Sequence, residues 1–170
     1  MGNLLAGSHL PILARICQIS KGNVLELGVG YNSTPLLHWM CADPKYNHSY
    51  LFSYETDKKW LELFSEYDTN NHVIDHVENW DEIMLEEMKW GLAFIDCRPA
   101  KERRNLAIRL KDCADYIILH DSEPEIDRFY RYSSIYKHFK YRYDYTSVGK
   151  PFTTVLSNKF NVERIFEQYE

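Results

Sequence analysis

The sequence lacks the features of a membrane-spanning or secreted chain. No apolar run reaches the roughly 18 residues that a helix needs to cross a bilayer, and no basic leader of a signal peptide is present. The four cysteines are scattered, without the paired spacing of a zinc site or a disulfide framework; they are Cys17, Cys41, Cys97 and Cys113. We therefore expect a cytoplasmic protein whose cysteines are small buried hydrophobic residues.

A surplus of basic residues, which marks many nucleic-acid-binding domains, is also missing. The chain has 20 Lys and Arg against 25 Asp and Glu, a formal net charge of −5 at pH 7. This balance argues against nucleic acid as the main partner. No internal repeat or low-complexity segment interrupts the 170 residues, of which 45% are hydrophobic. We expect one globular domain over residues 1–170.

The strongest local pattern lies in residues 23–36. A short apolar run ends at two glycines, Gly28 and Gly30. Such a run, followed by turn residues, predicts a buried parallel strand and a tight loop that a ligand can approach closely. Ser33 or Thr34 can cap the helix that follows, whose first N–H groups are free to meet a ligand. The pattern predicts a site for a nucleotide-type cofactor.

An acidic residue inside this strand changes the prediction. Glu26 precedes Gly28 by two positions, where a carboxylate would crowd a dinucleotide pyrophosphate but suits a ligand with an amine and a positive centre. The stretch resembles motif I of the class I S-adenosylmethionine (SAM) methyltransferases, acidic-x-Gly-x-Gly-x-Gly. Asn32 replaces the third glycine, and asparagine tolerates a left-handed backbone better than other side chains. The resemblance implies SAM as the cofactor.

Apolar runs and turn residues alternate along the rest of the chain. Helices are predicted over 8–19, over 34–42, after residue 56, after residue 99 and with Pro124 in the first turn, and strands over 23–27, 49–54, 72–77, 90–95, 115–119, 139–145 and 153–156. This alternation predicts an α/β protein with a mostly parallel sheet and a C-terminal antiparallel hairpin. The order matches the Rossmann-like sheet of the class I methyltransferases. Residues 1–20 would form an N-terminal helix over the sheet edge or the cofactor cleft.

Polar residues at the strand ends would complete the cofactor site. Glu55 ends the second strand, where a carboxylate can accept hydrogen bonds from both ribose hydroxyls, and Thr56 would cap the next helix. After the third strand, Glu78 or Asn79 would bind the exocyclic amine of adenine, and the ring of Trp80 would lie against the base. The alternatives are a solvated charge at Glu55 and ordinary core packing of Trp80.

The fourth and fifth predicted strands end in candidates for catalysis, Asp96 and His120-Asp121, and Asp96 would also border the cofactor. In one hypothesis His120 is the general base for a hydroxyl acceptor, oriented by Asp96 or Asp121. In another, all three residues bind Mg²⁺ or Mn²⁺, which lowers the pKa of the acceptor. Metal-dependent catechol-type O-methyltransferases resemble this arrangement, but their next residue is Asn and here it is Ser122. Helix capping by His120 and Asp121 remains the structural alternative.

Two arginine-containing segments each have a structural and a functional interpretation. Arg98, Arg103 and Arg104 would bind an anionic group of a substrate or, the interpretation we favour, form a solvated helix face. Residues 128–143 alternate aromatic and basic side chains, which is typical either of single-stranded nucleic-acid binding or of a half-buried strand. We favour the strand, and a tyrosine-rich surface there would also suit contact with sugar rings.

Short sequence segments at residues 33–37, 94–96, 120–123 and 151–154 resemble those of small O-methyltransferase-like domains of glycan-modifying systems. The resemblance implies methyl transfer from SAM to a hydroxyl of a small molecule or carbohydrate, with S-adenosylhomocysteine (SAH) as product. The alternatives are a non-catalytic SAM-fold binding module and an RNA methyltransferase, whereas a nucleotide-binding oxidoreductase disagrees with Glu26 and Asn32. Little chain is left for a substrate cap, which leaves open a homodimer or a domain of a larger glycan-modifying protein.

Overall fold

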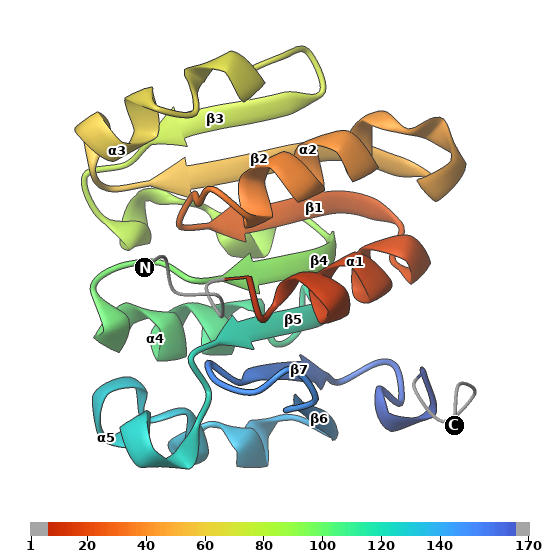
Figure 1. Cartoon of the computed structure of the whole chain (residues 1–170), viewed down its shortest axis with the longest axis vertical. Helices are drawn as coiled ribbons and strands as arrows, with labels where there is room; N and C mark the ends of the chain where they lie inside the picture. The colour runs from red at the N-terminus through yellow and green to blue at the C-terminus, as the bar shows by residue number, and fades with distance from the viewer. Residues whose placement is uncertain (1–6, 166–170) are drawn as a thin grey trace.

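The computed structural model describes residues 7–165, so residues 1–6 of the predicted N-terminal segment lie outside the described residues. Its centre is a seven-stranded sheet in the order β3-β2-β1-β4-β5-β7-β6 (Figure 1). The strands are β1 Gly22–Leu27, β2 His48–Glu55, β3 His72–His76, β4 Trp90–Ile95, β5 Ala114–His120, β6 Tyr141–Tyr145 and β7 Thr153–Ser157. Strands β1 to β5 are parallel, and β7 runs antiparallel to β5 and β6. The predicted α/β sheet with a C-terminal antiparallel hairpin is confirmed.

Both faces of the sheet are covered, because the central strands are apolar on both sides. All six residues of β4 are buried. Leu92 and Phe94 pack into the hydrophobic core on one face, whereas Ala93 and Ile95 pack into the core on the other. This alternation follows from the two-residue period of a strand. The strand order places β1, β4 and β5 in the middle of the sheet.

Helices α1 (Leu10–Ile19) and α2 (Ser33–Ala42) cover one face of the sheet, and α4 (Ala100–Leu110) covers the other (Figure 1). The expectation that the first helix lies over the sheet edge or the cleft is wrong, because Leu13 and Ile16 are fully buried against this face. The turn before α1 reaches the carboxyl end of β5, where Ser8 Oγ lies 3.4 Å from His120 Nε2. None of the described helices is long and apolar enough to cross a bilayer.

Two predicted helices are shorter than expected. After β2, α3 spans Lys58–Glu62 and is capped by Asp57, not by Thr56; the Asp57 carboxylate accepts hydrogen bonds from the N–H groups of Lys59 and Trp60. The helix expected near residue 124 is a 3-10 turn, Pro124–Ile126, followed by one turn of helix, α5 (Asp127–Tyr130). These short elements line the edge at which the parallel strands end.

Candidate active site

The loop after β1 depends on Gly28 for its packing. The φ angle of Gly28 is +95°, and a Cβ atom there would lie 2.7 Å from the backbone N of Cys97, at the end of β4. Only glycine fits this left-handed, closely packed position. Asn32 has a φ of −104°, so its tolerance of left-handed backbone is not used. Gly28 is therefore the glycine of the motif that the structure requires, because it lets the loop after β1 pack against the end of β4.

Glu26 lies beneath this loop and has no exposed surface. Both carboxylate oxygens accept from the Thr34 hydroxyl at 3.0 Å, and Oε2 accepts from the Ser53 hydroxyl at 2.6 Å. Thr34 in turn accepts from the Gly30 N–H at 2.9 Å. The sequence predicted a carboxylate facing a ligand amine and a cap at Ser33 or Thr34; instead Asn32 is at the N-cap without a side-chain bond, and Glu26 and Thr34 hold the loop.

A chain of hydrogen bonds runs from Glu26 through Ser53 and His72 to His38. Ser53 Oγ lies 2.9 Å from His72 Nε2, and His72 Nδ1 lies 3.0 Å from Nδ1 of the partly exposed His38. Burial raises the pKa of Glu26 to about 7 and lowers the pKa of His72 to about 4. Each member can both donate and accept a hydrogen bond. The chain therefore keeps a buried carboxyl satisfied in either protonation state.

Glu55 and Thr56 lie together at the end of β2, as predicted. Glu55 is 6% exposed, and its Oε1 accepts hydrogen bonds from the backbone N–H groups of Thr56 and Asp57 at 2.7 and 3.1 Å. These bonds go to one oxygen and fix the carboxylate at the strand end. A buried, oriented carboxylate at this position does not fit the alternative of a solvated charge.

A pocket of about 280 Å³ opens beside Thr56. Glu78, Asn79, Trp80 and Asp81 form one wall, and Pro99, Lys101 and Glu102 form the opposite wall. The three residues predicted to contact adenine therefore do line a pocket. Trp80 is 3% exposed and donates its indole N–H to the Arg98 carbonyl at 2.7 Å. Its contact with the core matches the packing alternative better than a ring stacked on a base.

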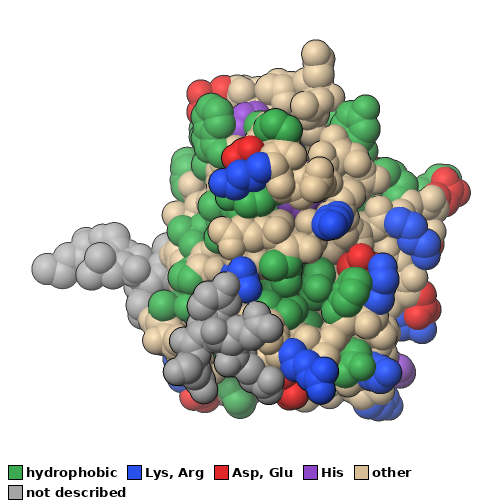
Figure 2. All heavy atoms as spheres, turned by 90° about the vertical axis from the view of Figure 1, so that its right-hand side faces the viewer, with side chains coloured by type: hydrophobic (Ala, Val, Ile, Leu, Met, Phe, Trp, Pro, Cys, Tyr) green, Lys and Arg blue, Asp and Glu red, His purple; other side chains and the backbone are tan. Residues whose placement is uncertain are grey.

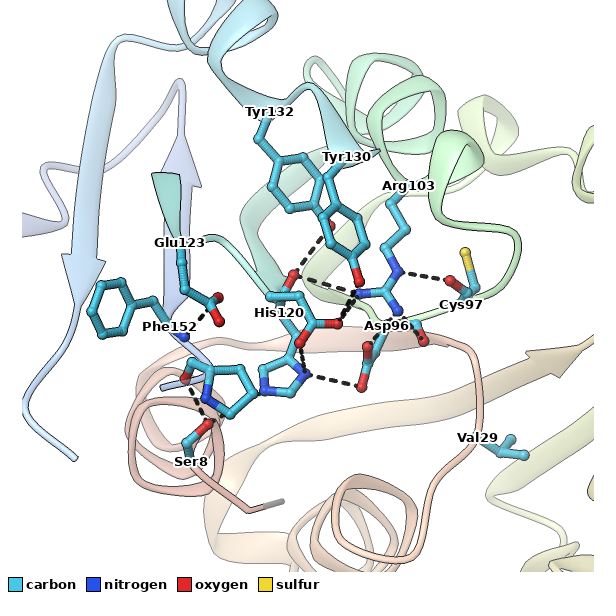
Figure 3. A network of polar contacts seen from close by, with 12 residues as sticks. Ser8, Val29, Asp96, Cys97, Arg103, His120, Glu123, Tyr130, Tyr132 and Phe152 are labelled. Atoms are coloured by element: carbon cyan, nitrogen blue, oxygen red, sulfur yellow. Dashed lines mark hydrogen bonds and ion pairs between the residues drawn. The ribbon is translucent and has the colours of Figure 1, made fainter. Parts of the chain in front are cut away.

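A buried arginine holds the acidic residues at the ends of β4 and β5 (Figure 3). Arg103 of α4 is 6% exposed; its Nη2 lies 2.8 Å from Asp96 Oδ1, and its Nη1 lies 3.0 Å from Asp121 Oδ2. Its Nε donates to the Cys97 carbonyl at 2.7 Å. The charge pattern of the helix predicts a solvated face for this arginine. That prediction is wrong, because the basic helix directs this one side chain inward to neutralise two carboxylates.

The three residues proposed as metal ligands do come together. One ligand atom each of Asp96, His120 and Asp121 lies within 4.8 Å of the others. Both carboxylates, however, already bind the Arg103 guanidinium. A divalent cation placed between them would meet a fixed positive charge within a few ångströms, and its ligands would have to abandon their ion pairs. The donor set therefore does not fit Mg²⁺ or Mn²⁺.

His120 is oriented as predicted but does not face a pocket. Its Nδ1 lies 3.2 Å from Asp96 Oδ2, and its Nε2 lies 3.4 Å from the Ser8 hydroxyl (Figure 3). The ring, 6% exposed, packs edge-on against the His9 ring at 4.6 Å. Burial lowers the pKa of His120, but Asp96 and Asp121 outweigh burial and raise the pKa above its ordinary value. In this arrangement His120 is a buried partner of Asp96 and not an accessible base.

Of the two carboxylates in this cluster, Asp121 lines a pocket of about 540 Å³ together with Thr56, Arg98, Pro99, Ala100, Arg103 and Tyr130. Its Oδ2 accepts hydrogen bonds from Arg103 and from the Tyr130 hydroxyl, both at 3.0 Å, whereas Oδ1 has only His120 Nδ1 at 3.7 Å. Asp121 adopts a φ of +57°, and aspartate is among the side chains enriched in that region. Tyr130 belongs to the aromatic and basic segment 128–143, but no sequence signal indicated that this tyrosine would bind Asp121.

No protein-family model and no curated protein matches the sequence. Among solved structures, the chain is similar to an rRNA methylase from Streptococcus thermophilus, with 13% identity and a TM-score of 0.58 over 94% of this chain and 100% of that one. It is also similar to precorrin-6y C5,15-methyltransferase from Geobacter metallireducens, with 10% identity and a TM-score of 0.56 over 92% and 90%. The chain has the Rossmann-like methyltransferase fold.

A third solved structure of similar fold contains the cofactor product SAH. TrmK of M. capricolum, in complex with SAH, matches with 12% identity and a TM-score of 0.53 over 88% of this chain and 69% of that one. The names of the first two neighbours state rRNA and a precorrin as acceptors. At these identities the likeness establishes the fold, and the acceptor must be argued from the site.

Proposed function

We propose that this protein is a SAM-dependent methyltransferase. The observation that carries the proposal is that two pockets adjoin at the carboxyl edge of the sheet, sharing Thr56 and Pro99. In open parallel sheets this edge is where ligands bind. One pocket is bordered by the residues predicted for the adenosine part of the cofactor, and the other is bordered by an oriented carboxylate. A cofactor and an acceptor can thus occupy one continuous groove.

The chain's own residues fit the cofactor. Glu55 would accept hydrogen bonds from the ribose hydroxyls, with its side chain held by the N–H groups of Thr56 and Asp57. Adenine would occupy the smaller pocket between Asn79 and Pro99. Bound there, SAM supplies an electrophilic methyl group and leaves as SAH. The loop held by Glu26 through Thr34 would shape the rest of the cofactor site.

We assign the proton transfer to Asp121. Asp121 Oδ1, the oxygen that is not bound by Arg103 or Tyr130, would accept the proton of the acceptor hydroxyl while the methyl group passes from the sulfur of SAM to the oxygen of that hydroxyl. Arg103 and Tyr130 bind Oδ2 and thereby fix the orientation of this carboxylate, which borders the larger pocket. His120 and Asp96 act as positioning residues behind it. The geometry comes first in choosing a general base, and it favours a hydroxyl acceptor.

The aromatic and basic C-terminal segment supports the fold more than it offers a nucleic-acid surface. The Arg142 guanidinium lies 3.6 Å from the centre of the Tyr136 ring, and its Nη2 lies 2.7 Å from Asp144 Oδ2. Tyr141, Tyr143 and Tyr145 of β6 pack against the core. These contacts occupy side chains that RNA would need, so a small-molecule or carbohydrate acceptor is the preferred proposal over RNA.

The test is SAH formation by the full chain with SAM and separate panels of monosaccharides, phenolic compounds and total RNA. We expect turnover with a hydroxyl compound, and Asp121→Asn should reduce it by about 100-fold or more, the scale of a lost acid–base group. The matched control is Tyr130→Phe, which removes one hydrogen bond to Oδ2 but keeps the carboxylate. Turnover with RNA alone would contradict the hydroxyl acceptor, and SAM binding without any turnover would favour a binding module.

A further inference from the structure

A second cluster of reactive side chains lies at the opposite edge of the sheet, where the strands begin. It consists of Cys17 near the end of α1, Cys41 near the end of α2 and His48, the first residue of β2. Figure 2 views the molecule from this side, where hydrophobic side chains gather near the middle and several Lys and Arg side chains surround them. The cluster is separated from the candidate active site by the length of the strands.

The spacing of the three side chains suits a metal ion. One ligand atom each of Cys17, Cys41 and His48 lies within 4.8 Å of the others, and Cys17 Sγ lies 3.4 Å from His48 Nε2. Zinc–sulfur and zinc–nitrogen bonds at a tetrahedral angle place the two ligand atoms about 3.6 Å apart. The distance of 3.4 Å between Cys17 Sγ and His48 Nε2 is therefore close to the ligand spacing of a zinc site.

The exposure and the charge of the three side chains suit a divalent cation. Cys17 is fully buried, whereas Cys41 and His48 are partly exposed, which leaves a path for an ion from solvent. Two thiolates and a neutral imidazole would also balance the charge of a divalent cation, and this neutrality suits a half-buried position.

We propose that Cys17, Cys41 and His48 form a binding site for Zn²⁺. Both cysteines bind as thiolates and together release two protons. His48 binds through Nε2, which gives up its 2.9 Å contact with the Cys17 carbonyl. The imidazole stays neutral, with its one N–H proton on Nδ1. Three protein ligands leave a fourth position for water. The ion ties the ends of α1 and α2 to the start of β2, so its role is to stabilise this edge of the fold.

The experiment uses the full chain with its cysteines reduced, dialysed against a chelator and then titrated with Zn²⁺ in competition with a chromophoric indicator. We expect one equivalent to bind, and Cys41→Ser and His48→Gln should each weaken binding by at least about tenfold. Both side chains are partly exposed, so these variants are expected to fold, which circular dichroism checks. Titration with Co²⁺ should give a thiolate-to-metal charge-transfer band that Cys41→Ser diminishes.

Two matched controls locate the site. Cys113→Ser removes a buried cysteine outside the cluster and should leave Zn²⁺ affinity and the Co²⁺ band unchanged. His120→Asn alters the other group of potential ligands and should also leave them unchanged. Absence of stoichiometric Zn²⁺ binding by the reduced wild-type chain would overturn the proposal. So would a loss of binding in Cys113→Ser or His120→Asn equal to the loss in Cys41→Ser.

Discussion

Arg103 Nη2 lies 2.8 Å from Asp96 Oδ1, although Arg103 is a helix residue with 6% of its side chain exposed and Asp96 follows the neighbouring strand β4. The same guanidinium binds Asp121 after β5. One buried cation thus sets the relative positions of two strand ends and of α4. The Asp96 and Arg103 pair is therefore the structural centre of the candidate active site.

Replacing Arg103 should destabilise the protein strongly. Arg103→Met leaves two partly buried carboxylates without their counter-charge, and we expect the free energy of unfolding to fall by about 3 kcal/mol. Arg104→Met, on the same helix but outside this cluster, is the matched control and should change stability by less than about 0.5 kcal/mol. Urea denaturation of both variants measures the difference. Equal effects at the two positions would show that Arg103 is not a buried counter-ion.

The pH dependence of turnover distinguishes the two candidate bases. A carboxylate base gives a rate that is nearly flat from about pH 6 to 8, because simple carboxylic acids titrate near pH 4. A histidine base gives a rate that rises about tenfold per pH unit below its pKa, and the pKa of His120 is raised above its ordinary value. We expect the flat profile. A steep rise through neutral pH that His120→Asn abolishes would restore His120 as the base.

The two glycines of the β1 loop should respond differently to an added methyl group. Gly28→Ala forces a side chain into left-handed backbone and against Cys97, so we expect a loss of at least about 2 kcal/mol in stability. At Gly30 the nearest neighbour of a new Cβ is Ser33 Oγ at 3.4 Å, and Gly30→Ala should change stability by less than about 1 kcal/mol. Thermal unfolding compares them. A tolerated Gly28→Ala would contradict the close contact between the loop and β4.

Glu26 should make stability decrease as the pH rises. Its pKa is raised to about 7 in the fold, so the unfolded chain loses the proton first, and folding becomes less favourable between the unfolded and folded pKa values. The difference in unfolding free energy between Glu26→Gln and wild type should shift by about 2 kcal/mol in favour of the variant from about pH 5 to 8. Urea melts at several pH values measure this. A difference independent of pH would indicate that Glu26 titrates normally.

Much of the fold follows from local patterns in the sequence. The apolar run that ends at Gly28 and the fully apolar run of β4 are strands because their residues can be buried on both faces. The antiparallel end follows from the alternation of tyrosines with polar residues in β6. The N-cap of α3 is Asp57 and not the predicted Thr56. The prediction was off by one residue because either side chain can accept the hydrogen bonds of a helix N-terminus.

The parts of the site that sequence reasoning missed depend on contacts between distant segments. Arg103 lies one helical turn before Leu106 and two turns before Leu110, so its spacing places it on the buried face of α4. The two carboxylates that it binds, however, follow separate strands. The contact of Ser53 with both Glu26 and His72 arises because β2 lies between β1 and β3 in the sheet. The cysteine spacing excluded a zinc motif, yet folding brings Cys17 and Cys41 to the same edge. Such groupings require the topology and the direction of each side chain.

The most direct test of the central claim is calorimetric titration of the full chain with SAM and SAH in the presence of EDTA. We expect dissociation constants in the micromolar range without metal. Glu55→Gln should weaken binding by about tenfold or more, because the ribose loses a charged acceptor, while Asp121→Asn should leave the affinity within about twofold because it acts on the acceptor. No heat of binding at millimolar SAM or SAH would contradict the account.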